Sequence, residues 1–268
     1  MTVTTPMSST AIPAADVAFE CEGVCLEFKK AGSVQRVLDD VSIQVRRGEF
    51  LTIVGGSGVG KTTLLRAFAG LIAPAGGTIR AAGRQVTSPP DDVILVFQDY
   101  SNSLLPWRTV QGNIAFGLES KGIPKAERPG RIADALRMVG LDQAAGKYPW
   151  ELSGGMQQRL QIARALALEP ASLLMDEPFG SLDAITKATL QDELQKVHAK
   201  TGTTIVFITH DVEEAVYLGD RAIVLAGQPA GITAEIAIDL PRPRDQLTTR
   251  EAPRFLELRH ALHEAIKH

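Results

Sequence analysis

Two glycine-rich segments each stand at the start of an expected helix. The first, "GGSGVGKT" at residues 55–62, matches the pattern G-x-x-x-x-G-K-[ST] and lies between an apolar run and a helical pattern. Its glycines allow backbone N–H groups to surround phosphates. Lys61 can reach the β- and γ-phosphates of a nucleotide, and the Thr62 hydroxyl can ligate Mg²⁺. The nucleotide-binding residues expected here are Gly55, Gly56, Ser57, Gly58, Val59, Gly60, Lys61, Thr62 and Thr63.

The second segment, "ELSGGMQQRL" at residues 151–160, also suits an anion. The first N–H groups of a helix are unpaired and the helix dipole is positive there, so Ser153, Gly154 and Gly155 can bind a phosphate. The alternative is purely structural: an N-cap serine followed by a glycine turn. A chain with one phosphate loop has no evident need for a second phosphate site, and the sequence alone leaves that question open.

Three apolar runs end in polar side chains. The run "SLLMDE" ends in Asp176 and Glu177, whose side chains point to opposite faces if both lie in a strand. We therefore expect Asp176 to hold Mg²⁺ and Glu177 to act as a general base toward water. His210 ends "TTIVFITH" as a candidate γ-phosphate contact, and Gln98 ends "VILVFQ" as a group that can touch Mg²⁺ or orient water. The alternatives are a solvated acid pair and a structural histidine.

Length, net charge and composition argue against several classes of function. The 268 residues carry a net charge of −3 and are 44% hydrophobic, which argues against a nucleic-acid-binding surface over the whole protein. The apolar runs have strand length, whereas a membrane-spanning helix needs about 20 residues. Cys21 and Cys25 are expected on the same strand face as reduced thiols, because they cannot form a zinc site without further ligands. Phe28 could stack on adenine or pack in the sheet.

The pattern of elements predicts an α/β fold. Short β-branched runs at 51–55, 93–98, 172–177, 203–210 and 221–227 alternate with helical patterns at 61–72, 125–139, 154–168, 184–200 and 211–218. Before residue 50 the pattern indicates two antiparallel strands with a turn at "KKAGS". We expect a disordered tail at 1–16, a domain at 17–240 with a helical insertion at about 99–168, and a connector with one helix at 241–268.

These motifs, in this order, resemble the ATP-binding subunit of an ABC transporter. The resemblance spans residues 19–240 and includes the phosphate loop, "VFQ", "LSGGMQQR", "LLMDEP", "SLD" and "ITHD". Met156 stands where the family signature LSGGQ has glutamine. The resemblance implies a P-loop NTPase of ABC type, with a RecA-like mixed sheet core, an antiparallel β subdomain and a helical subdomain. ATP and Mg²⁺ are the implied ligands.

The resemblance also offers a reason for the second anion site. In this family two ATP-binding subunits pair head to tail, and the signature helix of one binds the γ-phosphate held by the phosphate loop of the other. Ser153, Gly154 and Gly155 would then act on the ATP of a second copy of this chain, and Asp183 would lie at that interface. The implied partners are membrane permease subunits and, indirectly, a substrate-binding protein. The implied location is peripheral, on the cytoplasmic face of the inner membrane.

A narrower resemblance concerns the transported substrate. The segments "LLPWRTV" and "NIAFGL" resemble the subunits of importers for nitrate, taurine and alkanesulfonates. Leu104 and Trp107 are candidate exposed contacts with the permease, or else part of the core of the helical subdomain. Sugar importers append a regulatory domain that is not expected here. The alternatives are an importer of another substrate, an exporter or lipid transporter subunit, an ABC ATPase acting on nucleic acid or the ribosome, and a P-loop kinase.

Overall fold

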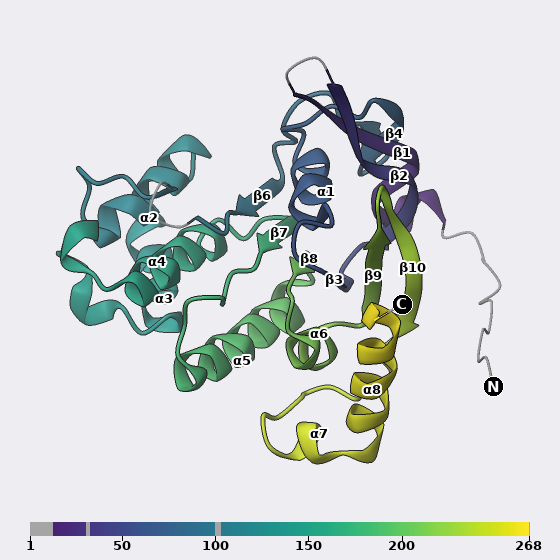
Figure 1. Cartoon of the computed structure of the whole chain (residues 1–268). Helices are drawn as coiled ribbons and strands as arrows, with labels where there is room; N and C mark the ends of the chain where they lie inside the picture. Colours follow the sequence, from purple (N-terminus) through teal and green to yellow (C-terminus); the bar gives the residue numbers. More distant parts are fainter. Residues whose placement is uncertain (1–12, 31–32, 100–102, 268) are drawn as a thin grey trace.

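Apolar runs form the parallel centre of the sheet. The computed structural model describes residues 13–30, 33–99 and 103–267, and its strands form one ten-stranded sheet with the order β5-β4-β1-β2-β10-β9-β3-β8-β7-β6 (Figure 1). The parallel strands are β3 (Phe50–Gly55), β6 (Val93–Val96), β7 (Ser172–Asp176), β8 (Thr204–Ile208) and β9 (Arg221–Gly227). Strands β3, β7 and β8 are buried throughout, as expected for strands covered on both faces.

The other half of the sheet is mainly antiparallel. Its strands are β1 (Val17–Lys30), β2 (Ser33–Arg46), β4 (Gly76–Ala81), β5 (Arg84–Gln85) and β10 (Ala230–Ala237). Strand β1 pairs with both β2 and β4, which confirms the predicted antiparallel pair. The middle of the turn expected between them, residues 31–32, lies outside the described residues. Strand β10 joins the two halves, since it pairs with β9 and, through Ala230 and Leu38, with β2.

The prediction that Cys21 and Cys25 share a strand face is wrong. Gly23 has a φ of 56°, and the pairing register of β1 shifts between Cys21 and Val24. This irregularity resets the alternation of side chains, so Cys21 is buried while Cys25 is half-buried. The Cys25 thiol lies 3.3 Å from Oδ1 of Asp39. Both cysteines are free thiols, as predicted.

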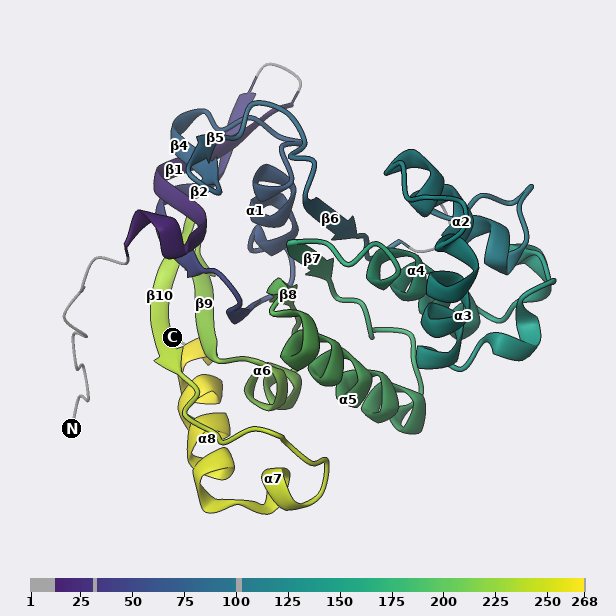
Figure 2. The same cartoon turned by 180° about the vertical axis from the view of Figure 1, so that it is seen from behind.

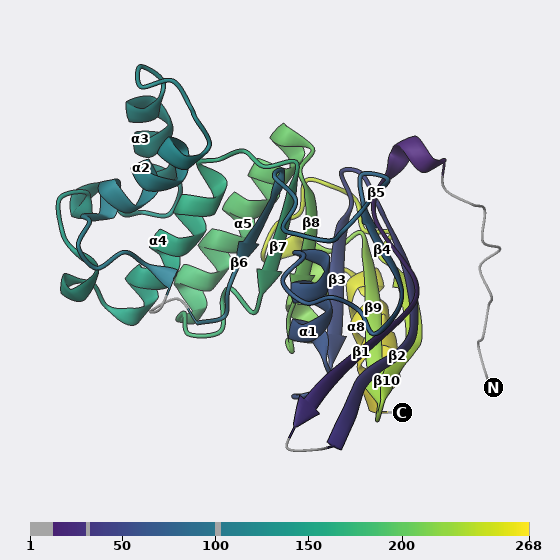
Figure 3. The same cartoon turned by 90° about the horizontal axis from the view of Figure 1, so that it is seen from above.

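Helices cover the sheet and extend beyond its β6 edge. Helix α1 lies between the antiparallel strands and the parallel strands, whereas α2, α3 and α4 form a separate lobe beyond β6 (Figures 2 and 3). The helices are α1 (Lys61–Phe68), α2 (Val110–Ser120), α3 (Arg128–Met138), α4 (Gly154–Leu166), α5 (Ala184–Thr201) and α6 (Val212–Leu218). This lobe is the predicted helical insertion, although α2 was not among the predicted helices and residues 100–102 lie outside the described residues.

The parallel strands divide their side chains between two hydrophobic cores. Leu174, Val206 and Ile208 face the core that contains α1 and the antiparallel strands. Their neighbours Leu173 and Phe207 face the core shared by the helical lobe, α5, α6 and the C-terminal helix. The alternation follows from the two-residue period of a strand. The same strands therefore anchor both lobes of the molecule.

The described segments nearest to the two ends of the chain pack against the domain. The C-terminal segment holds α7 (Thr248–Glu251) and α8 (Pro253–Lys267), and α8 is the predicted helix. Arg244 in the connector donates hydrogen bonds to the carbonyls of Tyr217 and Gly219, both at 2.8 Å, and so caps the end of α6. Of the predicted disordered tail, residues 1–12 lie outside the described residues. Residues Ala14–Asp16 form a 3-10 turn, whose last carbonyl accepts a hydrogen bond from the backbone of Arg47.

Within the described ranges, no helix combines the length and the apolar character that crossing a bilayer requires.

Candidate functional site

The predicted phosphate loop connects β3 to α1, and its shape requires glycine. Gly55 has a φ of 155°, and a Cβ atom there would lie 2.3 Å from the carbonyl oxygen of Leu225. Gly60 has a φ of 108°, and a Cβ there would lie 2.8 Å from side chains of Val37 and Leu38. No side chain caps the start of α1 at Gly60. The loop thus leads directly into a helix start whose backbone N–H groups can bind an anion.

Lys61, the first residue of α1, is held inside the loop. Its side chain is buried, and Nζ donates hydrogen bonds to the carbonyl oxygens of Gly55 at 2.8 Å and Gly56 at 2.9 Å. Burial lowers the pKa of Lys61, and the nearby carboxylates of Glu177 and Asp176 oppose that shift. These two hydrogen bonds fix the ammonium group within the loop, beside the N–H groups that are candidates for binding a phosphate.

Thr62 and Asp176 meet although they are 114 residues apart in sequence. The Thr62 hydroxyl donates to Oδ1 of Asp176 at 3.1 Å. Burial raises the pKa of Asp176, while the hydrogen bond from Thr62 lowers it. A hydroxyl and a carboxylate are the oxygen ligands that Mg²⁺ favours, and Mg²⁺ commonly completes its octahedron with water and phosphate oxygens. The pair thus fits a magnesium ion bound together with a nucleotide.

Glu177 brings the other two predicted strand-end residues together. Its Oε2 accepts a hydrogen bond from Nε2 of Gln98 at 3.3 Å and lies 3.1 Å from Nδ1 of His210. Strand β7 ends at Asp176, and Glu177 itself has a φ of 45°, a conformation that L-residues adopt at a cost. Its side-chain direction is therefore set by this turn rather than by strand alternation. Glu177 and Asp176 still have different partners, as the predicted division of roles requires.

The second predicted anion site forms a separate group. Ser153 is the N-cap of α4, its Oγ accepting a hydrogen bond from the backbone N–H of Met156 at 3.3 Å, and Gly154 and Gly155 open that helix. Asp183 caps α5 in the same way, through the N–H of Thr186 at 3.0 Å, and this hydrogen bond lowers the pKa of Asp183. No hydrogen bond between described residues connects this group to the phosphate loop.

The starts of α4 and α5 lie next to each other and not next to the phosphate loop. The Ser181 hydroxyl donates to Oε1 of Gln158 on α4 at 2.6 Å, and a Cβ on Gly155 would lie 3.3 Å from the Leu182 side chain. Both helices begin away from α1, and α4 belongs to the helical lobe (Figure 2). The structural interpretation of Ser153 as an N-cap is confirmed, and its role toward a phosphate stays a prediction.

The candidate aromatic and apolar contacts differ in how exposed their side chains are. Phe28 lies on β1 with 43% of its surface exposed, so its ring is accessible and adenine stacking stays a prediction. Trp107 is 70% exposed, as a docking contact requires. Leu104 is only 5% exposed, so of its two alternatives the place in the core of the helical lobe is confirmed and the exposed contact is not. The Asn113 amide donates to the carbonyls of Leu105 and Arg108, which folds this segment back onto α2 and buries Leu104 in the lobe's core.

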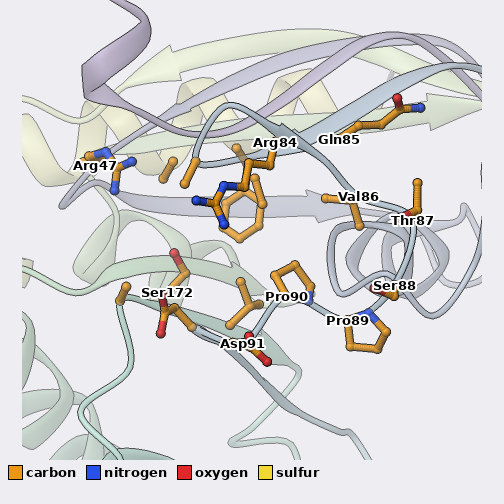
Figure 4. A pocket seen from close by; sticks show the side chains of 17 residues that line it. Arg47, Arg84, Gln85, Val86, Thr87, Ser88, Pro89, Pro90, Asp91 and Ser172 are labelled. Atoms are coloured by element: carbon orange, nitrogen blue, oxygen red, sulfur yellow. The ribbon is translucent and has the colours of Figure 1, made fainter.

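A groove of about 540 Å³ opens at the opposite end of the parallel strands. It is lined by the loop that leads into β6, by the start of β7 at Ser172 and by Arg47, and the Arg84 side chain projects into it (Figure 4). The phosphate loop after β3 and the polar residues Asp176 and His210 lie at the carboxyl ends of the parallel strands. This groove is therefore separate from the candidate nucleotide site.

The sequence did not reveal which groups hold the His210 loop in place. Glu214 on α6 is buried, and its carboxylate accepts hydrogen bonds from the Thr209 hydroxyl and from Nε2 of Gln191. Its position four residues after His210, on the first turn of a predicted helix, was the available signal. A single acidic residue at a helix start is usually solvent-exposed, so that signal was weak.

A family model described as ABC transporter matches residues 38–180 of this chain. A nitrate import ATP-binding protein of Synechococcus elongatus is 48% identical over 228 residues, which cover 84% of this chain but only 34% of that longer protein. A taurine import ATP-binding protein of Rhizobium johnstonii is 43% identical over 241 residues, covering 88% of this chain and 91% of that protein.

The fold also matches a solved structure, a dimeric ATP-binding cassette in a post-hydrolysis state bound to ADP and Pi. The TM-score is 0.75 at 30% sequence identity, and the match covers 82% of this chain and 98% of that one.

Replacing Lys61 with methionine tests the loop directly, because it removes the ammonium and keeps the side-chain length. Hydrogen bonds to charged groups contribute about 1.5–3 kcal/mol, so we expect the affinity for MgATP to fall by about 10- to 100-fold. Calorimetric titration with a non-hydrolysable ATP analogue measures the change. Lys125→Met, at an exposed position, is the matched control. An unchanged affinity of Lys61→Met would contradict the assignment.

Proposed function

The chain belongs to the ABC transporter family of ATP-binding proteins, and on that premise we propose that it energises the import of a small anion through separate permease subunits. The observation that carries the ATPase part is the grouping of Lys61, Thr62, Asp176, Glu177 and His210 at the carboxyl ends of β3, β7 and β8, where Thr62 contacts Asp176 and His210 contacts Glu177. The family is one of ATPases, and the related cassette bound to ADP and Pi agrees with hydrolysis.

In the proposed reaction the loop N–H groups and Lys61 bind the phosphates and stabilise the charge that develops on the transferred phosphoryl group. Thr62, Asp176 and Gln98 would hold Mg²⁺, which would neutralise part of that charge. Glu177 accepts a proton from the attacking water, and Gln98 and His210, both within 3.3 Å of its carboxylate, keep it in place. His210 also reaches the γ-phosphate.

The second anion site serves a second copy of the chain. Ser153, Gly154 and Gly155 lie in the helical lobe and have no hydrogen bond to the phosphate loop among the described residues, so they are free to bind a phosphate held by another subunit. An isologous head-to-tail pair then uses both glycine sites twice. The related cassette is a dimer, which supports this arrangement. Asp183, beside the signature helix, lies at the proposed interface.

The small-anion proposal rests on relatives named for nitrate and taurine import and on the segment around Trp107. Trp107 is largely exposed on the helical lobe, although large apolar side chains are usually covered. Contact with a membrane permease would cover it, and ATP-driven closure of the dimer would move the lobe and hence the permease. We accordingly place the protein at the cytoplasmic face of the inner membrane, with a substrate-binding protein acting through the permease.

Glu177→Gln tests the general base. The amide retains the shape of the side chain but cannot accept the proton, so we expect the rate of ATP hydrolysis to fall by about 100-fold or more while ATP binding persists. Phosphate release under single-turnover conditions and nucleotide titration measure the two quantities. Hydrolysis at the wild-type rate would remove Glu177 from its assigned role.

Mixed dimers test whether the signature acts on the other subunit's ATP. Lys61→Met and Ser153→Glu should each be inactive alone, the second because its carboxylate repels the γ-phosphate. Their mixture should recover up to about a quarter of the wild-type rate, since half of the dimers are mixed and each has one intact site of two. Mixing Lys61→Met with Glu177→Gln restores no intact site and serves as the control. A mixture of the first two that stays inactive would show that Ser153 acts within its own subunit.

Growth of a deletion strain tests the cargo. We expect loss of growth on taurine, on an alkanesulfonate or on nitrate as the sole sulfur or nitrogen source, with growth on sulfate and ammonium retained, because the ATPase drives uptake of one of these anions. A plasmid-borne wild-type gene should restore growth, and the Glu177→Gln gene should not. Normal growth on all five sources would contradict small-anion import and favour another substrate or an exporter.

A further inference from the structure

A buried ion pair lies beneath the loop that carries His210. Nζ of Lys187 on α5 lies 2.8 Å from Oε1 of Glu214 on α6 and 3.3 Å from Oδ2 of Asp211. The side chain of Glu214 is only 6% exposed, whereas that of Lys187 is 27% exposed. A carboxylate buried to this extent requires a charge partner, because its own desolvation is unfavourable. Lys187 is the cation that contacts it in the described part of the chain.

Both carboxylates that Lys187 contacts fix residues adjacent to His210. The other oxygen of Glu214 accepts a hydrogen bond from the Thr209 hydroxyl, and that hydroxyl in turn accepts one from the backbone N–H of Asp211 at 3.0 Å. Asp211 caps α6 through the N–H groups of Glu213 at 2.9 Å and Glu214 at 3.3 Å. The residues immediately before and after His210 therefore both belong to the network that Lys187 completes.

The other end of this network lies on the first turn of α5. The backbone N–H of Lys187 donates to the carbonyl of Asp183 at 2.9 Å, so Lys187 is one helical turn from the residue that caps the helix. The ammonium group thus connects the rigid start of α5 to a loop that lies after β8. His210 itself is mostly exposed, and among the described residues its side chain contacts Glu177, with Nδ1 3.1 Å from Oε2. Its orientation depends on the backbone on either side of it.

We propose that Lys187 is a positioning residue for ATP hydrolysis: through Glu214 and Asp211 it holds the His210 loop so that the imidazole meets Glu177 and the γ-phosphate. This inference rests on the proposed function. Without the ammonium, the Glu214 carboxylate is left uncompensated and turns toward water, which releases Thr209 and shifts the loop. Displacement of a catalytic group by about 1 Å can lower a rate by about 100-fold even when the substituted residue is remote from the chemistry.

The main experiment compares steady-state ATP hydrolysis by the wild type, Lys187→Met and Lys187→Arg. We expect Lys187→Met to lower kcat by about 10- to 100-fold with KM for ATP changed less than about twofold, because the nucleotide-binding loop is untouched. Lys187→Arg keeps the charge and should restore most of the rate. Lys196→Met is the matched control on the same helix, since its ion pair with Glu193 is exposed and remote from the loop.

A second comparison separates positioning from loss of folding. Lys187→Met/Glu214→Gln removes both charges, so the chain should fold with a melting temperature close to that of the wild type. Its kcat should still be below the wild-type value, because the contact of Lys187 with Asp211, next to His210, is lost as well. If this double variant hydrolyses ATP at the wild-type rate, the proposal is wrong, whatever the stability of the single variant.

A third comparison asks whether Lys187 acts through His210. In a His210→Ala background, Lys187→Met should cause no further loss of single-turnover rate, because the group it positions is gone. The same fold loss in both backgrounds would overturn the proposal. A wild-type chain without ATPase activity would overturn the proposed function as well. Active wild type with fully active Lys187→Met would overturn only this inference.

Discussion

The register of β8 between β3 and β7 is the constraint on which the rest of the site depends. Ile208 pairs with Ile53 of β3 on one side and with Asp176 of β7 on the other. Each of these strands then passes into a functional loop within two residues, at Gly55, Glu177 and His210. A one-residue slip of β8 would exchange its two buried faces, and both faces are filled by hydrophobic cores. Core packing thus fixes the relative positions of the polar groups.

This arrangement explains why the two proposed anion sites do not meet within one subunit. The phosphate loop depends on the sheet, because Gly55 fits against the backbone of β9 and Gly60 against β2. The signature depends on the helical lobe, where Ser153 caps α4 and Gly155 fits against Leu182. The two sites are therefore built on different lobes. A head-to-tail pair of such subunits would change its interface whenever ATP bridges them.

Sequence patterns predicted the central strands well because both faces of those strands are buried, which requires continuous apolar runs. They failed where tertiary contacts outweigh local preference. Strand β4 begins with two glycines, and α2 contains two glycines yet is held by a Thr109 cap and by buried Val110 and Ile114. The opposite faces of Cys21 and Cys25 result from a register shift at Gly23, and the burial of Leu104 results from hydrogen bonds of Asn113. No periodic pattern encodes such contacts.

The same difference between local sequence pattern and tertiary contact applies to the functional site. Each motif is a short stretch of sequence whose residue types indicate its chemistry. The contacts that orient the motifs join residues far apart in sequence, such as Gln98 and Glu177, which are 79 positions apart. Glu177 illustrates the difference. Its type and place at a strand end suggest a base, yet its φ of 45° takes it off the strand, and the contacts with Gln98 and His210 then orient its carboxylate. Glu214, which accepts a hydrogen bond from Thr209 beside His210, belongs to the same set of long-range contacts although it lies outside the motifs.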